Sequence, residues 1–179
     1  MANVFLEVVG TYYAKIWDIK NDSSVGAAMA EIASSDPTLD YELESDLSTG
    51  GDRSFAWISH TISAPLKSRT NKVRKPGVYR IDEAVMGSAV LAWQYYIERP
   101  VGPGKDKFID LIKSGDTEEA QKLRKSVGFK RVSLTFRDSF KLPDDSEPLQ
   151  DGDIIIWRCV VVLRDGMDLS QNSGDNLYA

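Results

Sequence analysis

Hydrophobic and polar residues alternate along most of this chain, which is the pattern of β-strands with one face in the core and one in solvent. Alternation, together with β-branched and aromatic residues, predicts strands at 4–9, 11–19, 39–47, 54–62, 78–81, 89–97 and 132–142. The first two, separated by Gly10, form either one bent strand or a hairpin, and 39–47 and 54–62 form a second hairpin. Residues 153–163 are apolar on both faces through Ile154–Ile156, so this strand is expected at the centre of the sheet.

Helical spacing appears in two places. Val25, Met29 and Ile32 follow a cluster of capping residues and precede Pro37, which predicts a short helix of about ten residues. Between 105 and 127, a brief helical turn at 108–112 precedes a second helix. Asp116 and Glu119 form a capping box that opens this helix, and Gly128 suits the position just past its end at Val127. Residues 64–77 are predicted to form an exposed loop. The strand over 89–97 is expected to end at the cluster Pro100, Gly102, Pro103 and Gly104.

These elements predict an α+β fold, with a mixed, mainly antiparallel β-sheet, a short N-terminal helix and an inserted helix. With 179 residues, of which 42% are hydrophobic and 27% charged, the chain is long enough for one packed core. We expect a single globular domain over 1–164 and a flexible polar tail over 165–179.

The composition limits the cellular environments and the classes of partner that are expected for this chain. The net charge of −5 disfavours general binding to nucleic acid. No apolar run is long enough to cross a membrane, and the longest, 154–163, contains Arg158. The N-terminal residues 1–9 lack the basic start and long apolar run of a secretory signal. The single cysteine, Cys159, sits among apolar residues and has no internal disulfide partner, so a reducing cytoplasm fits best.

Two stretches resemble β-grasp domains. At the C-terminal end, a turn at 150–153 is followed by an apolar last strand that includes Trp157, as at the close of many β-grasp domains. Upstream, Trp93–Ile97 is similar to the aromatic strand of the transcobalamin C-terminal type of β-grasp module. The resemblance implies a ligand- or partner-binding module, in some members one face of a corrinoid site, which we do not transfer to this chain. The long basic loop and the insertion over 105–127 depart from the compact form of that family.

Catalytic and cofactor motifs are missing from the sequence. His60 is the only histidine; it could act as a general base beside Asp52 or Asp82, but a hydrogen-bonded structural histidine is the commoner role in an alternating strand. One histidine and one cysteine do not make the usual zinc site, and no metal site is predicted. The glycines lack the spacing of phosphate-binding loops, so no cofactor is expected.

The most basic stretch is the predicted loop. Its cations could engage phosphate, an acidic partner or a neighbouring copy, although a merely solvated loop is the favoured alternative. The candidate binding residues of this loop are Lys67, Arg69, Lys72, Arg74 and Lys75.

An aromatic strand supplies the other candidate binding residues, Trp93, Tyr95 and Tyr96. Core packing is the commoner role of such side chains, and lining a pocket or an interface is the alternative. Tyr95 and Tyr96 are adjacent, so they must point to opposite faces of the sheet.

Three functions stay open, of which the first is favoured. The chain is a non-catalytic binding or assembly module that uses an aromatic sheet face and the basic loop to engage a protein partner or a second copy. Alternatively, it is a small-molecule enzyme or carrier with a pocket lined by aromatic strand residues and His60, or a regulator that responds to a small anionic ligand.

Overall fold

The computed structural model describes residues 1–20, 23–44, 54–67, 72–132, 134, 138–140 and 148–163. Its longer strands are β1 (Ala2–Val8), β2 (Tyr13–Ile19), β3 (Leu39–Leu43), β4 (Phe55–Ile62), β7 (Gly77–Asp82), β9 (Ala89–Val101) and β11 (Ile154–Leu163). The short strands are β5 (Leu66–Lys67), β6 (Val73–Arg74), β8 (Ala84–Met86) and β10 (Gly128–Arg131). The helices are α1 (Val25–Ser35), α2 (Lys105–Lys113), α3 (Thr117–Arg124) and the 3-10 turn Asp138–Phe140.

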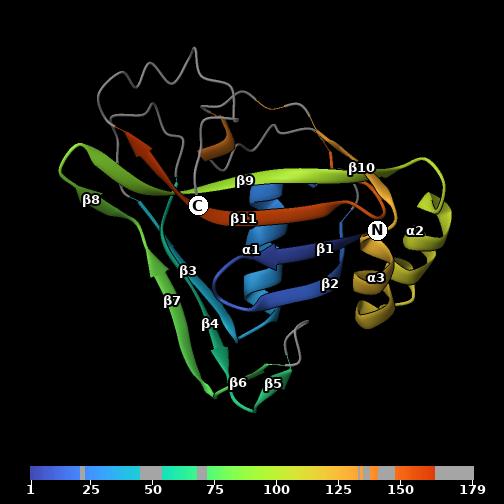
Figure 1. Ribbon diagram of the computed structural model, residues 1–179, viewed down its shortest axis with the longest axis horizontal. Helices are drawn as coiled ribbons and strands as arrows, with labels where there is room; N and C mark the ends of the chain where they lie inside the picture. The colour runs from blue at the N-terminus through green and yellow to red at the C-terminus, as the bar shows by residue number, and fades with distance from the viewer. Residues whose placement is uncertain are drawn as a thin grey trace.

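A six-stranded mixed sheet forms the centre of the molecule, in the order β10-β9-β11-β1-β2, with β8 also paired to β9 (Figure 1). β1 runs parallel to β11 and antiparallel to β2, and β9 runs antiparallel to β11 over residues 89–98. The prediction of an α+β fold with a mixed sheet is therefore confirmed. The prediction that the last strand is central is also confirmed, because β11 lies between β1 and β9.

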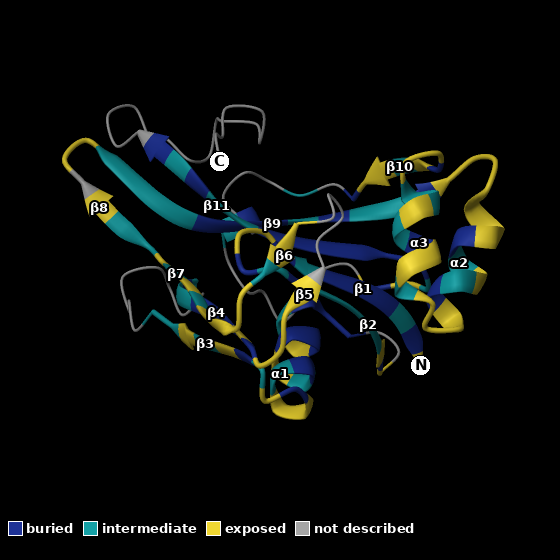
Figure 2. Ribbon diagram, turned by 60° about the horizontal axis from the view of Figure 1, so that its bottom comes forward, coloured by how far each residue is buried: buried dark blue, intermediate teal, exposed yellow. Residues whose placement is uncertain are grey.

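One face of the central sheet packs against α1. The hydroxyl of Ser24 accepts a hydrogen bond from the Ala27 N–H at 3.2 Å and so caps the first turn of this helix, as the polar cluster before it predicted. The apolar residues of α1 then meet the inward residues of three central strands in one fully buried cluster that includes Met29, Trp93 and Trp157. Figure 2 shows the same distribution: β1 and most of β11 are buried, and β9 is buried in its middle and intermediate toward its ends.

The second helical layer, α2 and α3, covers one end of the opposite face. Phe108 and Ile112 of α2 pack with Phe5, Ile154 and Ile156 of the sheet in a separate buried cluster. The predicted capping box is confirmed at its first residue, since the Asp116 carboxylate accepts a hydrogen bond from the Glu119 N–H at 3.1 Å. Among the helices of the described ranges, none is long and apolar enough to cross a lipid bilayer.

A smaller sheet, in the order β3-β4-β7, packs on the same side of the central sheet as α1. The predicted hairpin of 39–47 with 54–62 is confirmed by the antiparallel pairing of β3 with β4. This small sheet meets the turn of the β1–β2 hairpin at Gly10, whose φ is +89°. A Cβ on Gly10 would lie 2.5 Å from the Ile81 side chain, so glycine permits this close approach.

The strand before Pro100, Gly102, Pro103 and Gly104 does end within this cluster, at Val101, and Pro100 itself stays in β9, because it lies beyond the last residue paired with β11, where its missing N–H costs no bond to that strand. Three predictions about local structure are wrong. The helix expected to reach Val127 ends at Arg124, and Gly128 begins β10 instead of capping the helix.

The other two corrections concern loops and the late strand. Residues 64–77 are not only loop, because β5 and β6 pair in a short antiparallel hairpin. The strand expected over 132–142 is replaced at 138–140 by a 3-10 turn, and most of its remainder, like the tail 165–179, lies outside the described residues.

Candidate functional site

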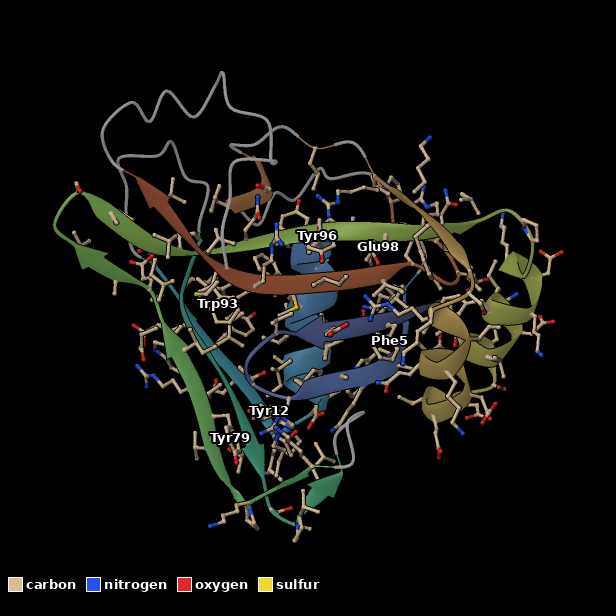
Figure 3. All side chains as sticks on the ribbon, in the orientation of Figure 1. Phe5, Tyr12, Tyr79, Trp93, Tyr96 and Glu98 are labelled. Carbon is tan, nitrogen blue, oxygen red and sulfur yellow. The ribbon has the colours of Figure 1, made fainter. Side chains whose placement is uncertain are left out.

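The face of the central sheet turned away from α1 carries a row of polar side chains beside the apolar contact with α2 and α3. Strand alternation sends Glu7 of β1 and Tyr96 and Glu98 of β9 to this face. Cross-strand register aligns Glu7 with Ile156 and Ile156 with Tyr96. Figure 3 labels Phe5, Tyr96 and Glu98 on this face. We call the group formed by Glu7, Gln94, Tyr96, Glu98, Arg124, Arg131 and Arg158 the Tyr96 face.

Arg124, the last residue of α3, joins this helix to two strands. Its Nη1 lies 2.5 Å from the Glu7 carboxylate and its Nη2 lies 3.4 Å from the Glu98 carboxylate. Burial opposes the charge of Arg124, but the ion pairs with Glu7 and Glu98 outweigh it and raise the pKa of the guanidinium. Since both glutamates are satisfied by Arg124, this part of the face has a structural role in docking α3.

Two further arginines flank the Tyr96 ring. The guanidinium carbon of Arg131 lies 4.2 Å from the ring centroid, and that of Arg158 lies 5.1 Å from it. Both distances are within the range of cation–π attraction. Arg158 is held in place by hydrogen bonds to the Gln94 side-chain oxygen at 3.2 and 3.4 Å, and the Gln94 amide in turn donates to Ser139 at 3.0 Å.

Arg131 is exposed, whereas Arg124 and Arg158 are partly buried, and only Arg124 of the three makes an ion pair with the described residues. The face thus carries three guanidiniums and only two carboxylates, both of which Arg124 engages. Burial, with a smaller contribution from Glu98, raises the pKa of Tyr96, so its hydroxyl is a hydrogen-bond donor and not a base at neutral pH. Such an arrangement suits the binding of an anion between Arg131 and Arg158.

The structure places the predicted basic residues elsewhere. Figure 1 shows the β5–β6 hairpin at the opposite end of the molecule from β9. Arg74 stacks on the Tyr12 ring at 4.3 Å, and Tyr12 in turn contacts the Tyr79 ring edge-on at 4.9 Å, so Arg74 fixes the hairpin to the β1–β2 turn. Lys72 and Lys75 are exposed. The side chains of Lys67 and Arg69 lie outside the described residues.

Of the predicted aromatic residues, only Tyr96 reaches the polar face. Trp93 and Tyr95 are buried in the α1 core, where the Trp93 indole donates to the Ile81 carbonyl at 3.3 Å and the Tyr95 ring packs 4.8 Å from that of Trp157. As predicted, Tyr95 and Tyr96 lie on opposite faces, which brings only one of the pair to a surface.

His60 is buried at the contact between the small sheet and the first hairpin. Its Nδ1 lies 2.8 Å from the Thr11 carbonyl, which fixes Nδ1 as the protonated nitrogen of the neutral ring, and its ring meets Tyr13 edge-on at 5.0 Å. Burial lowers the pKa of His60. Asp82, the proposed partner, is ion-paired to Arg80 at 2.7 Å instead, and Asp52 lies outside the described residues. This is the environment of a structural histidine.

A second polar cluster surrounds Asp36, just after α1. One carboxylate oxygen accepts from the Tyr13 hydroxyl at 2.9 Å and the Lys15 ammonium at 2.6 Å, and the other accepts from the N–H and hydroxyl of Thr38 at 3.0 and 2.6 Å. Burial pushes the pKa of Asp36 up, but the hydrogen bonds outweigh it and hold the pKa well below its usual range. Because every acceptor position of the Asp36 carboxylate is occupied, this cluster has a structural role and offers no acceptor to a ligand.

Sequence reasoning missed most of the Tyr96 face. Arg158 carried a signal, since a lone arginine in an otherwise apolar strand needs a polar partner, and the phase of β9 already placed Gln94, Tyr96 and Glu98 together. Arg124 and Arg131 come from a helix end and an edge strand, and their convergence on this face is a tertiary effect.

Within the described ranges, no three His, Cys, Asp or Glu side chains lie close enough together to hold a metal ion. No protein-family model, no curated protein and no solved structure matches this chain, so its functional interpretation depends on the Tyr96 face itself.

Proposed function

We propose that this protein is a non-catalytic binding module whose Tyr96 face binds acidic side chains of a protein partner. The observation that carries the proposal is the placing of the Arg131 and Arg158 guanidiniums within 5.1 Å of one tyrosine ring, with Arg131 exposed and unpaired among the described residues. A guanidinium held over an aromatic ring loses little side-chain entropy when it binds a carboxylate, and it keeps its N–H donors for that ligand.

We also propose a β-grasp-like arrangement for the central sheet. In support, β1 lies between its hairpin partner β2 and the last strand β11, and it runs parallel to β11. The β1–β2 hairpin is followed by α1, which covers one face of the sheet. The small sheet and the β5–β6 hairpin form an insertion between α1 and β8 that departs from a compact form of this topology. The fold-level likeness suits a binding module and does not specify its ligand.

The enzyme alternative is less well supported by the geometry. Its pocket would draw on the aromatic strand and His60, yet Trp93 and Tyr95 face α1 while Tyr96 faces the other way. His60 is engaged with the Thr11 carbonyl. If the protein is instead a regulator that responds to a small anion, the Tyr96 face is a better anion site than the basic loop. Arg74 of the loop stacks on Tyr12, whereas Arg131 is not paired with any carboxylate in the described part of the chain.

The proposal is tested by titrating the protein with a hexaglutamate peptide at low salt and following backbone amide signals by NMR. We expect the shifts to centre on Tyr96, Arg131 and Arg158, and Arg131→Gln or Arg158→Gln to weaken binding by about tenfold, since a charge-assisted hydrogen bond contributes roughly 1.5 kcal/mol. Inorganic phosphate, titrated separately, distinguishes a general anion site from one that selects a peptide.

Lys130→Gln is the matched control. Lys130 is exposed on the same short strand as Arg131, but alternation points its side chain to the other face, so its removal lowers the net charge equally without touching the site. If Lys130→Gln weakened peptide binding as much as Arg131→Gln, or if the shifts centred on Lys72 and Lys75, the Tyr96 face would not be the binding site.

A further inference from the structure

The strand β10 forms an open edge of the central sheet. It pairs antiparallel with β9 on one side, and no strand of the described residues pairs with its other side. Figures 1 and 2 both show β10 at the margin of the molecule. Its residues are exposed except Phe129, which is partly buried. An extended segment of another chain can therefore reach the backbone of this edge.

The backbone groups that point outward belong to Phe129 and Arg131. The Val132 N–H donates to the Ile97 carbonyl of β9 at 2.9 Å, and the backbone groups of successive residues in a strand point to opposite sides. The N–H and C=O groups of Arg131 and of Phe129 therefore point away from β9. Pro100, which has no N–H, lies opposite Phe129, where the ladder between β9 and β10 needs no donor. The outward donors and acceptors of this edge are used by no strand of the described residues.

The side chains of the same two residues lie on the Tyr96 face. Arg131 is in register with Glu98 and lies over the Tyr96 ring at 4.2 Å, and the Phe129 ring meets that of Phe108 edge-on at 5.3 Å. A strand added to β10 would set every second side chain on this face, with Cβ atoms about 5 Å from those of Phe129 and Arg131. A glutamate opposite Arg131 would reach its guanidinium, and an apolar residue opposite Phe129 would shield that ring from water.

The charge of β10 favours an acidic partner over a second copy of the chain. Lys130 and Arg131 are both exposed, and neither makes an ion pair with the described residues. An antiparallel pair of β10 strands centred on Lys130 or on Arg131 would set two like charges opposite each other, which is unfavourable. A pair centred on Phe129 would still gather the cations of both copies along one short edge. An acidic strand meets the opposite charge instead.

The other edge of the central sheet is less suited to an acidic strand. That edge is β2, and its only cation, Lys15, is ion-paired with Asp36 at 2.6 Å. Asp18 of β2 is exposed and would repel a carboxylate. Of the two edges, β10 is the one that fits an acidic segment.

We propose that the partner's acidic segment binds by strand addition: it lies antiparallel to β10 and exchanges backbone hydrogen bonds with Phe129 and Arg131. A glutamate of the segment lies opposite Arg131, and an apolar residue lies opposite Phe129. This inference rests on the proposed function of the Tyr96 face and names the conformation and the sequence pattern of its partner. Backbone and side chain are recognised together, so an acidic side chain binds well only within a segment that can form a strand.

N-methylated peptides test the backbone contact. The probe is the capped hexapeptide Thr-Thr-Glu-Thr-Val-Thr, titrated against the full chain at low salt and followed by backbone amide NMR. In the proposed register, the N–H groups of its glutamate and its valine donate to β10, and that of the threonine between them points away. We expect N-methylation of the glutamate or of the valine to weaken binding by about tenfold or more, because each change removes a hydrogen bond and adds a steric clash. N-methylation of the threonine between them is the matched control and is expected to change the dissociation constant by less than about twofold.

A double-mutant cycle tests the register. Arg131→Gln in the protein and glutamine for glutamate in the hexapeptide are each expected to weaken binding by about tenfold, and together by no more than either alone, because both remove the same contact. Lys130→Gln, which removes an exposed charge from the other face of β10, is expected to leave the binding of this hexapeptide nearly unchanged. Additive losses in the cycle would place the glutamate elsewhere and overturn the register.

The outcomes distinguish strand addition from the proposed function. If hexaglutamate binds to the Tyr96 face but N-methylation has the same effect at all three positions of the hexapeptide, strand addition is wrong and the side-chain site stands. The same conclusion follows if the hexapeptide does not bind where hexaglutamate does. If neither peptide shifts the signals of Tyr96 and Arg131, both proposals are wrong.

Discussion

At the scale of single residues, neighbours in one strand have opposite environments. Tyr95 is fully buried against Trp157, and Tyr96, the next residue, lies between two arginines on the far face. The alternation of a strand requires this separation, so it could be predicted from the sequence. Which of the two faces would be apolar could not, because that depends on whether a helix or two guanidiniums lie above it.

His60 gives a prediction with a defined sign. Burial lowers its pKa in the folded state below the 6.5 of the unfolded chain, so the unfolded state binds the proton more readily. The free energy of unfolding is expected to be full above about pH 7 and to fall as the pH drops through 6.5 toward the lower folded pKa. As this is the only histidine, its ring signals can be followed alone by NMR.

His60→Gln is the comparison for this pH dependence. The glutamine amide does not titrate, so the decline of stability between pH 7 and 5 is expected to flatten in this variant when unfolding is measured in urea. A folded-state pKa above 6.5 in the NMR titration, or an equal decline in the variant, would contradict the structural assignment.

Cys159 is expected to react slowly. Burial, with a smaller contribution from Asp82, raises the pKa of the thiol to about 12, so little thiolate is present at pH 8. Alkylation by iodoacetamide, followed by mass spectrometry, should therefore be on the order of 100-fold or more slower in the folded protein than in urea. Similar rates in both states would show that the thiol is not held as the structure has it.

At the scale of elements, the entry to β11 depends on one glycine. Gly152 has a φ of +85°, and a Cβ there would lie 2.8 Å from the Ile109 side chain and 3.2 Å from that of Pro100. The turn therefore brings β11, α2 and β9 close together. The turn itself could be predicted from the sequence, but its contact with α2 could not, because residues 109 and 152 are distant in the chain.

Gly152→Ala is expected to lower the free energy of unfolding by about 2–3 kcal/mol, since it adds a steric clash to an unfavourable φ. Gly87→Ala is the matched control: Gly87 also has a positive φ, of +59°, but nothing lies within 4 Å of its added Cβ. The control should cost only about 1 kcal/mol. Equal losses in urea denaturation would mean that the close packing at 152 contributes nothing.

At the scale of the whole molecule, Asp36 connects the layers. Through its carboxylate, the end of α1 contacts Tyr13 and Lys15 of the central sheet and Thr38 at the start of the small sheet. The pKa of Asp36 is lower in the folded state than in the unfolded chain, where it is about 3.9. The stabilisation by its carboxylate is therefore full above about pH 3.9 and is lost as the pH falls below that value.

Asp36→Asn is expected to cost about 2 kcal/mol at pH 7, because it removes the charge that Lys15 and the hydroxyls of Tyr13 and Thr38 satisfy. The cost should shrink toward pH 3, because the Asp36 carboxylate of the unfolded chain then takes up a proton while that of the folded protein stays ionised, which lowers the stability of the unmodified protein. Asp40→Asn, at an exposed carboxylate on β3, should change little at either pH when both variants are unfolded in urea. An Asp36→Asn loss that did not depend on pH would exclude the charge as its cause.

The sequence by itself determined the class of fold and the type of most elements. Local spacing specified the hairpin of 39–47 with 54–62, the helix capped by Ser24 and the central apolar strand at 154–163, because side-chain periodicity and capping act between near neighbours. Only the tertiary structure decided that Pro100 stays within a strand, that Arg74 is engaged with Tyr12, and that Arg124, Arg131 and Arg158 share one face. Each of these depends on contacts between segments far apart in the chain, which local periodicity does not encode.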